Sequence, residues 1–585
     1  MGALVLVVVT FVGYLVAYHT YGRFLARRIF RLDDSRQPPS VTLVDGVDYV
    51  PTRRGIIFGH HYTSIAGTGP IVGPAIGIIW GWVPAIIWVF VGSIVMGAVH
   101  DFGALVVSMR NEGKSLSEVA ARYLSGRART IFFLVVFLEL TVVIAIFGVV
   151  IASIFARYET AVVPIWLQIP IAVGLGLAVY RWKASVFWAT AVAVFAMYVT
   201  IVLGQYMPLE MRDVAVGGHV LPATGVWVLI LLVYAFVAST LPVTVLLQPR
   251  DYINAWQLFI AMGLLVAGVA ASAVTGGLEI VAPAVNLHPE GAPPIWPFLG
   301  VTIACGAISG FHCLVSGGTT AKQVAKESDA QFVGYGSMLL EGALAVLVIV
   351  TVAAGIGMAY TKATGETLTG VAAWNAHYAS WSAAQGLGSK IAAVVAGAAN
   401  MLATLGIPRE IGNIIMGVFI ASFAGTTLDT ATRIQRYVVS ELATDFRVKP
   451  LANRWAAGLV AVVTAGVLAF MTGAGGQGAL TLWPMFGAVN QLLAALALLL
   501  ITVYLRRRGT RGYLLTLVPC LFMLVLTVWA MVHNEITFVQ NPEGWPPYKH
   551  WTLVVVNAVT LVLALAMAVE AFANLARPTR CELNA

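Results

Sequence analysis

Charged residues are scarce in this sequence. Only 10% of the 585 residues are Asp, Glu, Lys or Arg, whereas 59% are hydrophobic, and the mean hydropathy is +0.87. This composition excludes an ordinary soluble globular protein. Apolar stretches of about 18 to 25 residues recur from end to end, the length that a helix needs to cross a bilayer. The alternating ten-residue segments of a membrane barrel are lacking. The sequence therefore predicts an all-α, polytopic membrane protein.

Cysteine and the common enzyme motifs are also scarce. The four cysteines, Cys305, Cys313, Cys520 and Cys581, show no CxxC spacing, which argues against a disulfide framework or a structural zinc site. No nucleophile elbow, phosphate loop or HExxH helix is present, so we expect neither an enzyme nor an ATP-driven pump. The net charge of +8 comes from short Lys and Arg runs between apolar stretches, which is typical of charge facing anionic lipid rather than nucleic acid.

Fifteen candidate spans can be placed on the sequence. They lie near 2–21, 56–79, 82–107, 130–155, 162–180, 184–205, 225–247, 254–275, 297–318, 332–360, 411–432, 453–472, 479–505, 512–532 and 551–574. Lys and Arg concentrate in alternate loops, beginning with the loop that holds Arg23 to Arg54 and ending after the last span. The positive-inside rule puts these loops in the cytoplasm, the N-terminus outside and the C-terminus inside.

One apolar segment does not fit this alternation. Counting 391–405 as a span would reverse the charge pattern of every later loop, so we predict that it is re-entrant on the outer side. It belongs to the longest loop, roughly 361–410, and long loops in compact proteins often serve as lids or binding elements.

The second span is unusually rich in Gly, Pro and polar residues. It reads GIIFGHHYTSIAGTGPIVGPAIGIIW and contains His60, His61, Thr63, Ser64, Gly67, Thr68 and Gly69. Gly and Pro at membrane depth free backbone groups, which are tolerated only where protein or a water-filled cavity satisfies them. A kinked, closely packed helix is the alternative. We predict a broken helix whose polar residues bind the substrate.

The ninth span repeats this theme in ACGAISGFHCLVSGGTTAK. A shift of 251 residues aligns Gly59 with Gly310, His61 with His312, Gly67 with Gly318 and Thr68 with Thr319. The charge argument makes the two spans cross in opposite directions, and paired broken helices in inverted halves point to a binding site at the midplane. The candidate substrate residues here are His312, Ser316, Gly317, Gly318 and Thr319.

Acidic residues inside the spans are candidates for ion coupling. The eleventh span ends ASFAGTTLDTATRIQRY, where Asp429 lies beside Thr426, Thr427 and Thr430. A carboxylate at this depth is costly unless paired or hydrated. Asp429 could carry a proton, while Ser422 and the threonines could ligate Na⁺. Alternatively, Asp429 could form an ordinary helix-end ion pair with Arg433 at i+4.

Further titratable residues lie in other spans. Glu139 and Glu341 interrupt apolar runs, and His100 with Asp101 closes the third span, near an interface. The histidines could titrate near the working pH or could only donate hydrogen bonds. Their spacing matches no known metal-ligand pattern, so we expect no metal.

The seventh span has a proline near its end, in LPVTVLLQPRDY. Pro242 interrupts the helix, and Arg250 with Asp251 could form a cytoplasmic cap or gate. This span also runs opposite to the second and is a competing partner for the inverted pair.

These motifs, together with GYGSMLLEG, resemble the carbon starvation protein A family from about residue 45 to 505. The resemblance implies an inner-membrane transporter of bacteria or archaea, linked to peptide uptake or proton-coupled pyruvate import. It also implies a LeuT-like five-plus-five inverted repeat. Seven spans separate the two broken helices where that fold has five. Three explanations remain open: two of the spans are extra, the seventh span is the true repeat partner of the second, or each repeat has seven helices.

The sequence and the resemblance together predict a secondary symporter for a small organic anion such as pyruvate or for short peptides. H⁺ is the expected coupling ion, with Na⁺ coupling or a passive channel as alternatives. We divide the chain into a first span and loop (1–55), a transporter core (56–505, with repeats at about 56–206 and 297–505 and helices 225–275 between them) and two C-terminal spans (506–585). Besides substrate and lipid no partner is indicated, and the oligomeric state is open.

Overall fold

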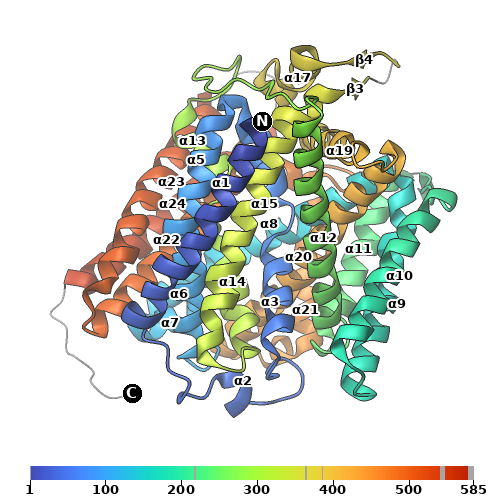
Figure 1. Ribbon diagram of the computed structural model, residues 1–585. Coiled ribbons are helices and arrows are strands. Elements are labelled where there is room, and N and C mark those ends of the chain that lie inside the picture. The colour runs from blue at the N-terminus through green and yellow to red at the C-terminus, as the bar shows by residue number, and fades with distance from the viewer. Residues whose placement is uncertain (1, 217–218, 363–364, 385, 541–546, 577–585) are drawn as a thin grey trace.

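A computed structural model describes residues 2–216, 219–362, 365–384, 386–540 and 547–576 (Figure 1). Within these residues, twelve helices are long and apolar enough to cross a bilayer, or thirteen if one bent pair counts as a span. The chain is thus a multi-pass, mainly helical membrane protein, as predicted. The expected count of fifteen spans is not confirmed.

The continuous spans are built from long helices. They are α1 (Gly2–Ala17), α5 (Trp82–Gly92) continued by α6 (Ala98–Met109), α8 (Gly126–Arg157), α9 (Val162–Gly176), α10 (Val186–Tyr206), α11 (Ala223–Thr240), α12 (Leu247–Val274), α15 (Ser337–Val350), α20 (Arg409–Asp445), α22 (Trp483–Arg507), α23 (Leu514–Gln540) and α24 (Pro547–Ala576). Several are extended by a turn of π-helix or 3₁₀-helix.

Two of the predicted spans are not among the twelve because neither forms one continuous helix as long as the others. The ninth consists of α13 (Ile295–Thr302) and α14 (Gly310–Gly318), separated by a non-helical segment. The twelfth, α21 (Arg454–Phe470), has only 17 residues. The bent pair is the second span, in which α3 (Arg54–Ile65) and α4 (Gly69–Gly77) meet at 42°.

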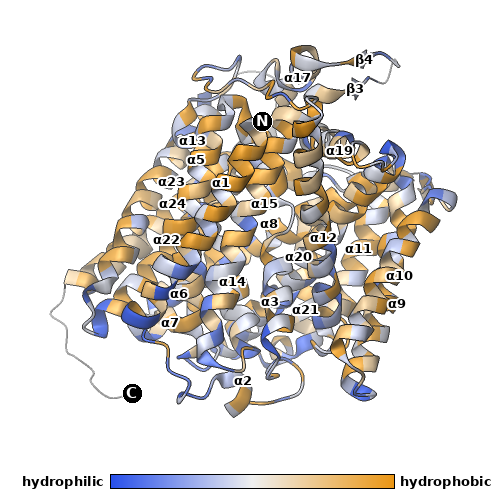
Figure 2. Ribbon diagram, viewed as in Figure 1, coloured by the Kyte–Doolittle hydropathy of each residue, from blue (hydrophilic) through white to orange (hydrophobic). Residues whose placement is uncertain are grey.

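The bundle has two ends that differ in character (Figures 1 and 2). At one, the α17 end, lie α17 (Gly370–Tyr378), α18 (Trp381–Ala384) and the hairpin of β3 (Tyr360–Thr361) with β4 (Thr367–Leu368). At the other, the α2 end, lie α2 (Pro39–Thr42) and α7 (Leu116–Tyr123), where hydrophilic residues gather. A second hairpin joins β1 (Val214–Val216) to β2 (His219–Leu221).

Burial separates the central helices from those that face lipid. Most of α8, α15, α20 and α22 is buried in the bundle, whereas α1 and α10 are largely exposed. On α10 the large side chains of Phe187, Trp188 and Phe195 are each about two-thirds exposed. Such an outward apolar face suits a hydrocarbon solvent. The functional residues are therefore sought in the centre.

The predicted re-entrant segment is α19 (Leu387–Ala403), which packs on α12 and α20. Near its start, Lys390 donates to the carbonyl of His377 in α17, 2.9 Å away. Just after its end, Thr404 lies 3.1 Å from Ser272, close to the end of α12. Both ends of α19 thus lie toward the α17 end. Because the segment enters and leaves on the same side, it does not change the sides on which the later loops lie.

Candidate functional site

The break between α3 and α4 lies in the centre of the bundle. Gly67 has no room for a side chain, because a Cβ there would collide with the Thr427 hydroxyl and Phe147. At Gly69 a Cβ would collide with the Cys305 thiol, and at Gly73 it would come within 2.7 Å of the Thr302 carbonyl. The glycines of the second span therefore allow α20 and the α13–α14 segment to approach its backbone closely.

Hydroxyls of α20 satisfy the backbone that the break frees. Thr426 donates to the carbonyl of Thr63 at 3.1 Å, and Thr427 donates to that of Ser64 at 3.3 Å. Both carbonyls belong to the last turn of α3, where carbonyls have no partner within the helix. The predicted substrate and ion-coupling residues of the second and eleventh spans therefore meet at one place.

A cavity of about 440 Å³ adjoins this break. Its walls include Gly67, Thr68 and Gly69 as well as Thr427 and Cys305. Most of the lining is apolar, with aromatic residues such as Phe147, Trp381 and Trp483. The presence of Trp381, from α18, shows that the cavity extends toward the α17 end. Its volume lies in the range of small-molecule sites.

A buried cluster of histidines and carboxylates lies beside the cavity. Asp101 accepts from His100 at 2.8 Å through one oxygen and from His312 at 2.9 Å through the other. The second ring nitrogen of His312 lies 3.3 Å from Glu341. All four side chains are fully buried. His100 and Asp101, which close the third predicted span, are thus buried inside the bundle.

The two broken spans also touch through hydroxyls. His60 Nε2 lies 3.3 Å from the Thr319 hydroxyl, and His61 Nδ1 lies 2.9 Å from that of Thr320. Ser316, Gly317 and Gly318 are buried but do not belong to the cavity wall described above. Of the predicted substrate residues, the cavity is lined by Gly67, Thr68 and Gly69.

A second charged cluster joins α12 to α3 and α20. Arg250 forms an ion pair with Asp429, and the Tyr234 hydroxyl donates to the same carboxylate at 2.7 Å. The adjacent Asp251 carboxylate pairs with His60 at 2.5 Å. These four ionisable groups are almost completely buried. Arg250 and Asp251, the predicted cap or gate, are each paired inside the protein, which is the condition for burying a charge.

Arg433 does not form the i+4 pair with Asp429 that the sequence allowed. Its guanidinium pairs with Asp48 at 2.8 Å and donates to the carbonyls of Ala238 and Leu241 beside Pro242. Pro242 follows the end of α11 at Thr240, so Arg433 satisfies carbonyls at the end of that helix.

Asp48, which sequence reasoning missed, is the centre of a cluster at the α2 end. Besides Arg433 it contacts Arg436 at 3.2 Å and accepts from the Tyr437 hydroxyl at 2.6 Å. Burial would raise the pKa of Asp48, but Arg433, Arg436 and Lys322 outweigh it and lower that pKa to about 2. Asp48 is one of four aspartates in a loop rich in arginine, so the sequence did not single it out.

Glu139 and Thr430 complete the predicted ion-coupling residues. Thr430 lies 3.0 Å from the Ser64 hydroxyl. Glu139 is buried on α8, and one of its oxygens lacks a hydrogen-bond partner among the described residues. Glu139 thus stands apart from both charged clusters.

Comparison with known proteins decides the family. The sequence model of the carbon starvation protein CstA family matches residues 2–530. The chain belongs to that family. The CstA family resemblance drawn from the sequence motifs is thereby confirmed.

Named relatives cover almost the whole chain. The pyruvate/proton symporter BtsT of Escherichia coli is 32% identical over 91% of this chain and 81% of its own. The peptide transporter CstA of Campylobacter jejuni is 30% identical over 97% and 84%, and that of Bacillus subtilis is 31% identical over 93% and 92%. A manganese transporter of Eremococcus coleocola is a structural match at a TM-score of 0.43 and 12% identity, over 91% and 98% of the chains.

Proposed function

We propose that this protein is a secondary symporter of the bacterial or archaeal inner membrane that imports a small organic anion such as pyruvate, or short peptides, together with protons. Relatives named as a pyruvate/proton symporter and as peptide transporters support this class of activity. The observation that carries the proposal is the broken α3–α4 helix, which lines a cavity of about 440 Å³ while its polar residues contact buried, paired charges.

The start of α4 supplies the site for a carboxylate. The helix begins at Gly69, and Gly67, Thr68 and Gly69 all line the cavity. The positive dipole end of a helix attracts anions. Pro70 has no N–H, and Ile71 and Val72 donate to the Thr68 carbonyl, so the attraction here rests on the helix dipole and on the backbone at Gly69. The absence of side chains at Gly67 and Gly69 allows close approach, and the apolar remainder of the cavity accommodates a methyl group or peptide side chains.

The Arg250–Asp429 pair supplies the proton switch. While Asp429 is ionised, it holds α12 against α20 through Arg250. Its second oxygen has no hydrogen-bond partner among the described residues and is free to take a proton. Protonation removes the negative charge, weakens the pair and releases α12 together with His60, which Asp251 ties to the same helix. Proton binding thereby acts on the broken helix that holds the substrate.

Sodium coupling is the second candidate, and one observation favours it. Thr426 and Thr427 gather hydroxyl oxygens around the freed carbonyls of Thr63 and Ser64. Carbonyl and hydroxyl oxygens beside a broken helix are the donors that coordinate Na⁺ in transporters.

The test follows proton movement in proteoliposomes that contain an internal pH indicator and no sodium. Adding pyruvate or a dipeptide outside should acidify the lumen for the wild type and for Glu410→Gln, an exposed carboxylate on the same helix. Asp429→Asn should lose the acidification yet keep exchange of internal for external substrate, which requires no net proton transfer. If substrate enters only after sodium is added, and the lumen is not acidified, Na⁺ bound at the Thr426–Thr427 site would be the coupling ion instead of H⁺.

A further inference from the structure

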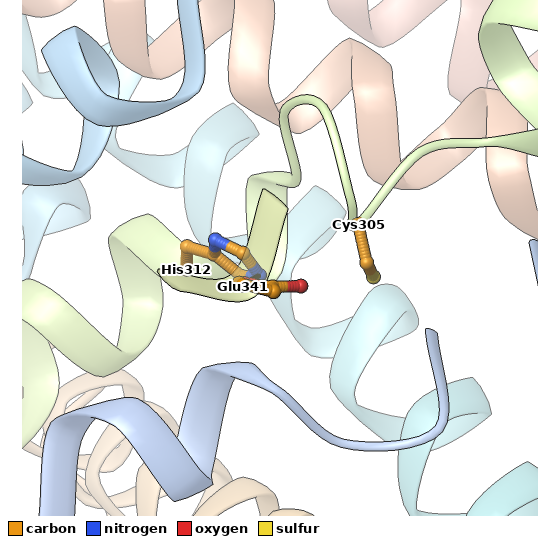
Figure 3. A group of neighbouring side chains, drawn as sticks. All are labelled: Cys305, His312 and Glu341. Atoms are coloured by element: carbon orange, nitrogen blue, oxygen red, sulfur yellow. Dashed lines mark ion pairs between the residues drawn. The ribbon is translucent and has the colours of Figure 1, made fainter. Parts of the chain in front are cut away.

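Three side chains of different chemistry converge at the wall of the cavity. The Cys305 thiol, the His312 imidazole and the Glu341 carboxylate each offer one donor atom, and these atoms lie within 4.8 Å of one another (Figure 3). Cys305 comes from the non-helical segment between α13 and α14, His312 from α14 and Glu341 from α15. Their positions in the sequence follow no ligand spacing, so only the fold reveals the group.

The bonding of His312 leaves one nitrogen for a ligand. Its Nδ1 lies 2.9 Å from an Asp101 oxygen, which as a carboxylate can only accept, so Nδ1 carries the hydrogen. In the neutral ring, Nε2 then carries a lone pair, and this nitrogen lies 3.3 Å from a carboxylate oxygen of Glu341. A carboxylate that orients a histidine in this way is the usual outer partner of a metal-binding imidazole.

Glu341 lacks the partners that a buried carboxylate needs. The side chain is fully buried, and neither oxygen makes a hydrogen bond among the described residues. Burying such a group is costly unless a cation or hydrogen-bond donors compensate it. His312, whose hydrogen points to Asp101, offers only its lone pair. A cation between these donors would satisfy both side chains.

We propose that Cys305, His312 and Glu341 bind one zinc-type divalent cation. One thiolate, one neutral imidazole and one carboxylate form a donor set that suits Zn²⁺, and the two negative ligands balance its charge. For tetrahedral bonds of about 2.0 to 2.3 Å, neighbouring donors lie roughly 3.3 to 3.8 Å apart. The His312–Glu341 distance meets this value. Cys305 has to approach slightly, which its non-helical segment permits.

Three protein ligands leave a fourth coordination position. Because Cys305 also lines the cavity, a further ligand could reach the cation from the cavity side. An open position is the property of metal sites that bind a further ligand, whereas closed four-ligand sites are structural. The site is independent of the proposed symport, because its occupancy can be measured without transport.

The test uses the purified full-length protein, stripped by a chelator and reloaded with Co²⁺. We expect a thiolate-to-cobalt charge-transfer band that Zn²⁺ displaces and that Cys305→Ser abolishes. Cys313→Ser and Cys520→Ser, which remove buried thiols outside the group, should retain the band. Size-exclusion elution reports whether each variant is folded.

A second measurement keeps the proposal testable if Cys305→Ser fails to fold. Zinc content of the wild type should approach one ion per chain, and Asp101→Asn should weaken zinc binding by about 10- to 100-fold, as expected for loss of an outer partner. No band in the wild type, a band that survives Cys305→Ser, or equal zinc affinity in Asp101→Asn would overturn the site. In that case His312 and Glu341 are only an ion pair.

Discussion

At the residue scale, the decisive feature is which buried charge pairs with which. The sequence identified Asp429 because a carboxylate at membrane depth is costly. It identified Arg250 and Asp251 as a cap or gate, and His60 as part of the broken second span. It could not supply their partners, since these lie 179 positions apart for Arg250 with Asp429 and 191 for His60 with Asp251. The local alternative, Arg433 at i+4, instead pairs with Asp48. Partner choice is set by the packing of three helices.

The Arg250–Asp429 pair should be energetically coupled. Arg250→Leu leaves Asp429 buried without its cation, and breaking such a pair costs about 3 to 5 kcal/mol. We expect a clear loss of thermal stability in detergent, measured by the unfolding of purified protein. The double variant Arg250→Leu with Asp429→Leu should recover most of that loss, because no charge is left unpaired. Additive losses in the double variant would show that the two residues are not coupled.

The Asp48 cluster predicts a pH dependence with a definite sign. Its pKa is lowered to about 2 from an ordinary value of 3.8, so its stabilising contribution is complete above about 4 and is lost as the pH falls toward 2. Hydrogen exchange of the loop around Asp48, corrected for intrinsic rates, should therefore rise in the wild type as the pH falls from about 4 toward 2. Asp48→Asn should raise exchange there at pH 7. Exchange in the wild type that stays constant down to pH 2 would contradict this assignment.

At the element scale, the break between α3 and α4 organises the site. Its location was predictable, because clustered Gly and Pro at membrane depth are incompatible with a straight lipid-facing helix. The neighbours that fill the break were not: Thr427 and Cys305 arrive from α20 and from the α13–α14 segment. Sequence reasoning therefore found the broken helix but could not tell that Gly67 to Gly69 line the cavity whereas Gly317 and Gly318 do not.

Gly67→Ala tests this packing. The added methyl group would collide with the Thr427 hydroxyl and Phe147, and overpacking of this kind costs about 1 to 3 kcal/mol. We expect the ratio of folded to unfolded protein to fall at least about fivefold, the factor that 1 kcal/mol represents, and substrate uptake to fall because the strain lies at the cavity wall. Gly55→Ala, at the start of α3 where nothing lies within 4 Å of the new Cβ, is the matched control. Equal uptake by the two variants would show that the break tolerates a side chain.

At the scale of the whole molecule, composition was enough to predict a helical, multi-pass membrane protein, and the motifs were enough to predict its family. The number of spans was harder to predict, because hydropathy does not distinguish a continuous helix from the interrupted α13–α14 segment. The cavity, which would hold the proposed substrate, lies on the α17 side of the break. The Asp48 cluster of paired charges lies on the opposite side, at the α2 end.

The central claim is proton-driven import of a small carboxylate. The most direct measurement is uptake of labelled pyruvate and, in parallel, of a labelled dipeptide into proteoliposomes under an imposed inward proton gradient without sodium. We expect at least one of them to accumulate above its external concentration, and we expect dissipation of the gradient to abolish the accumulation. Uptake of both that never exceeds equilibrium, with protons or with sodium, would contradict the symporter and identify a passive channel.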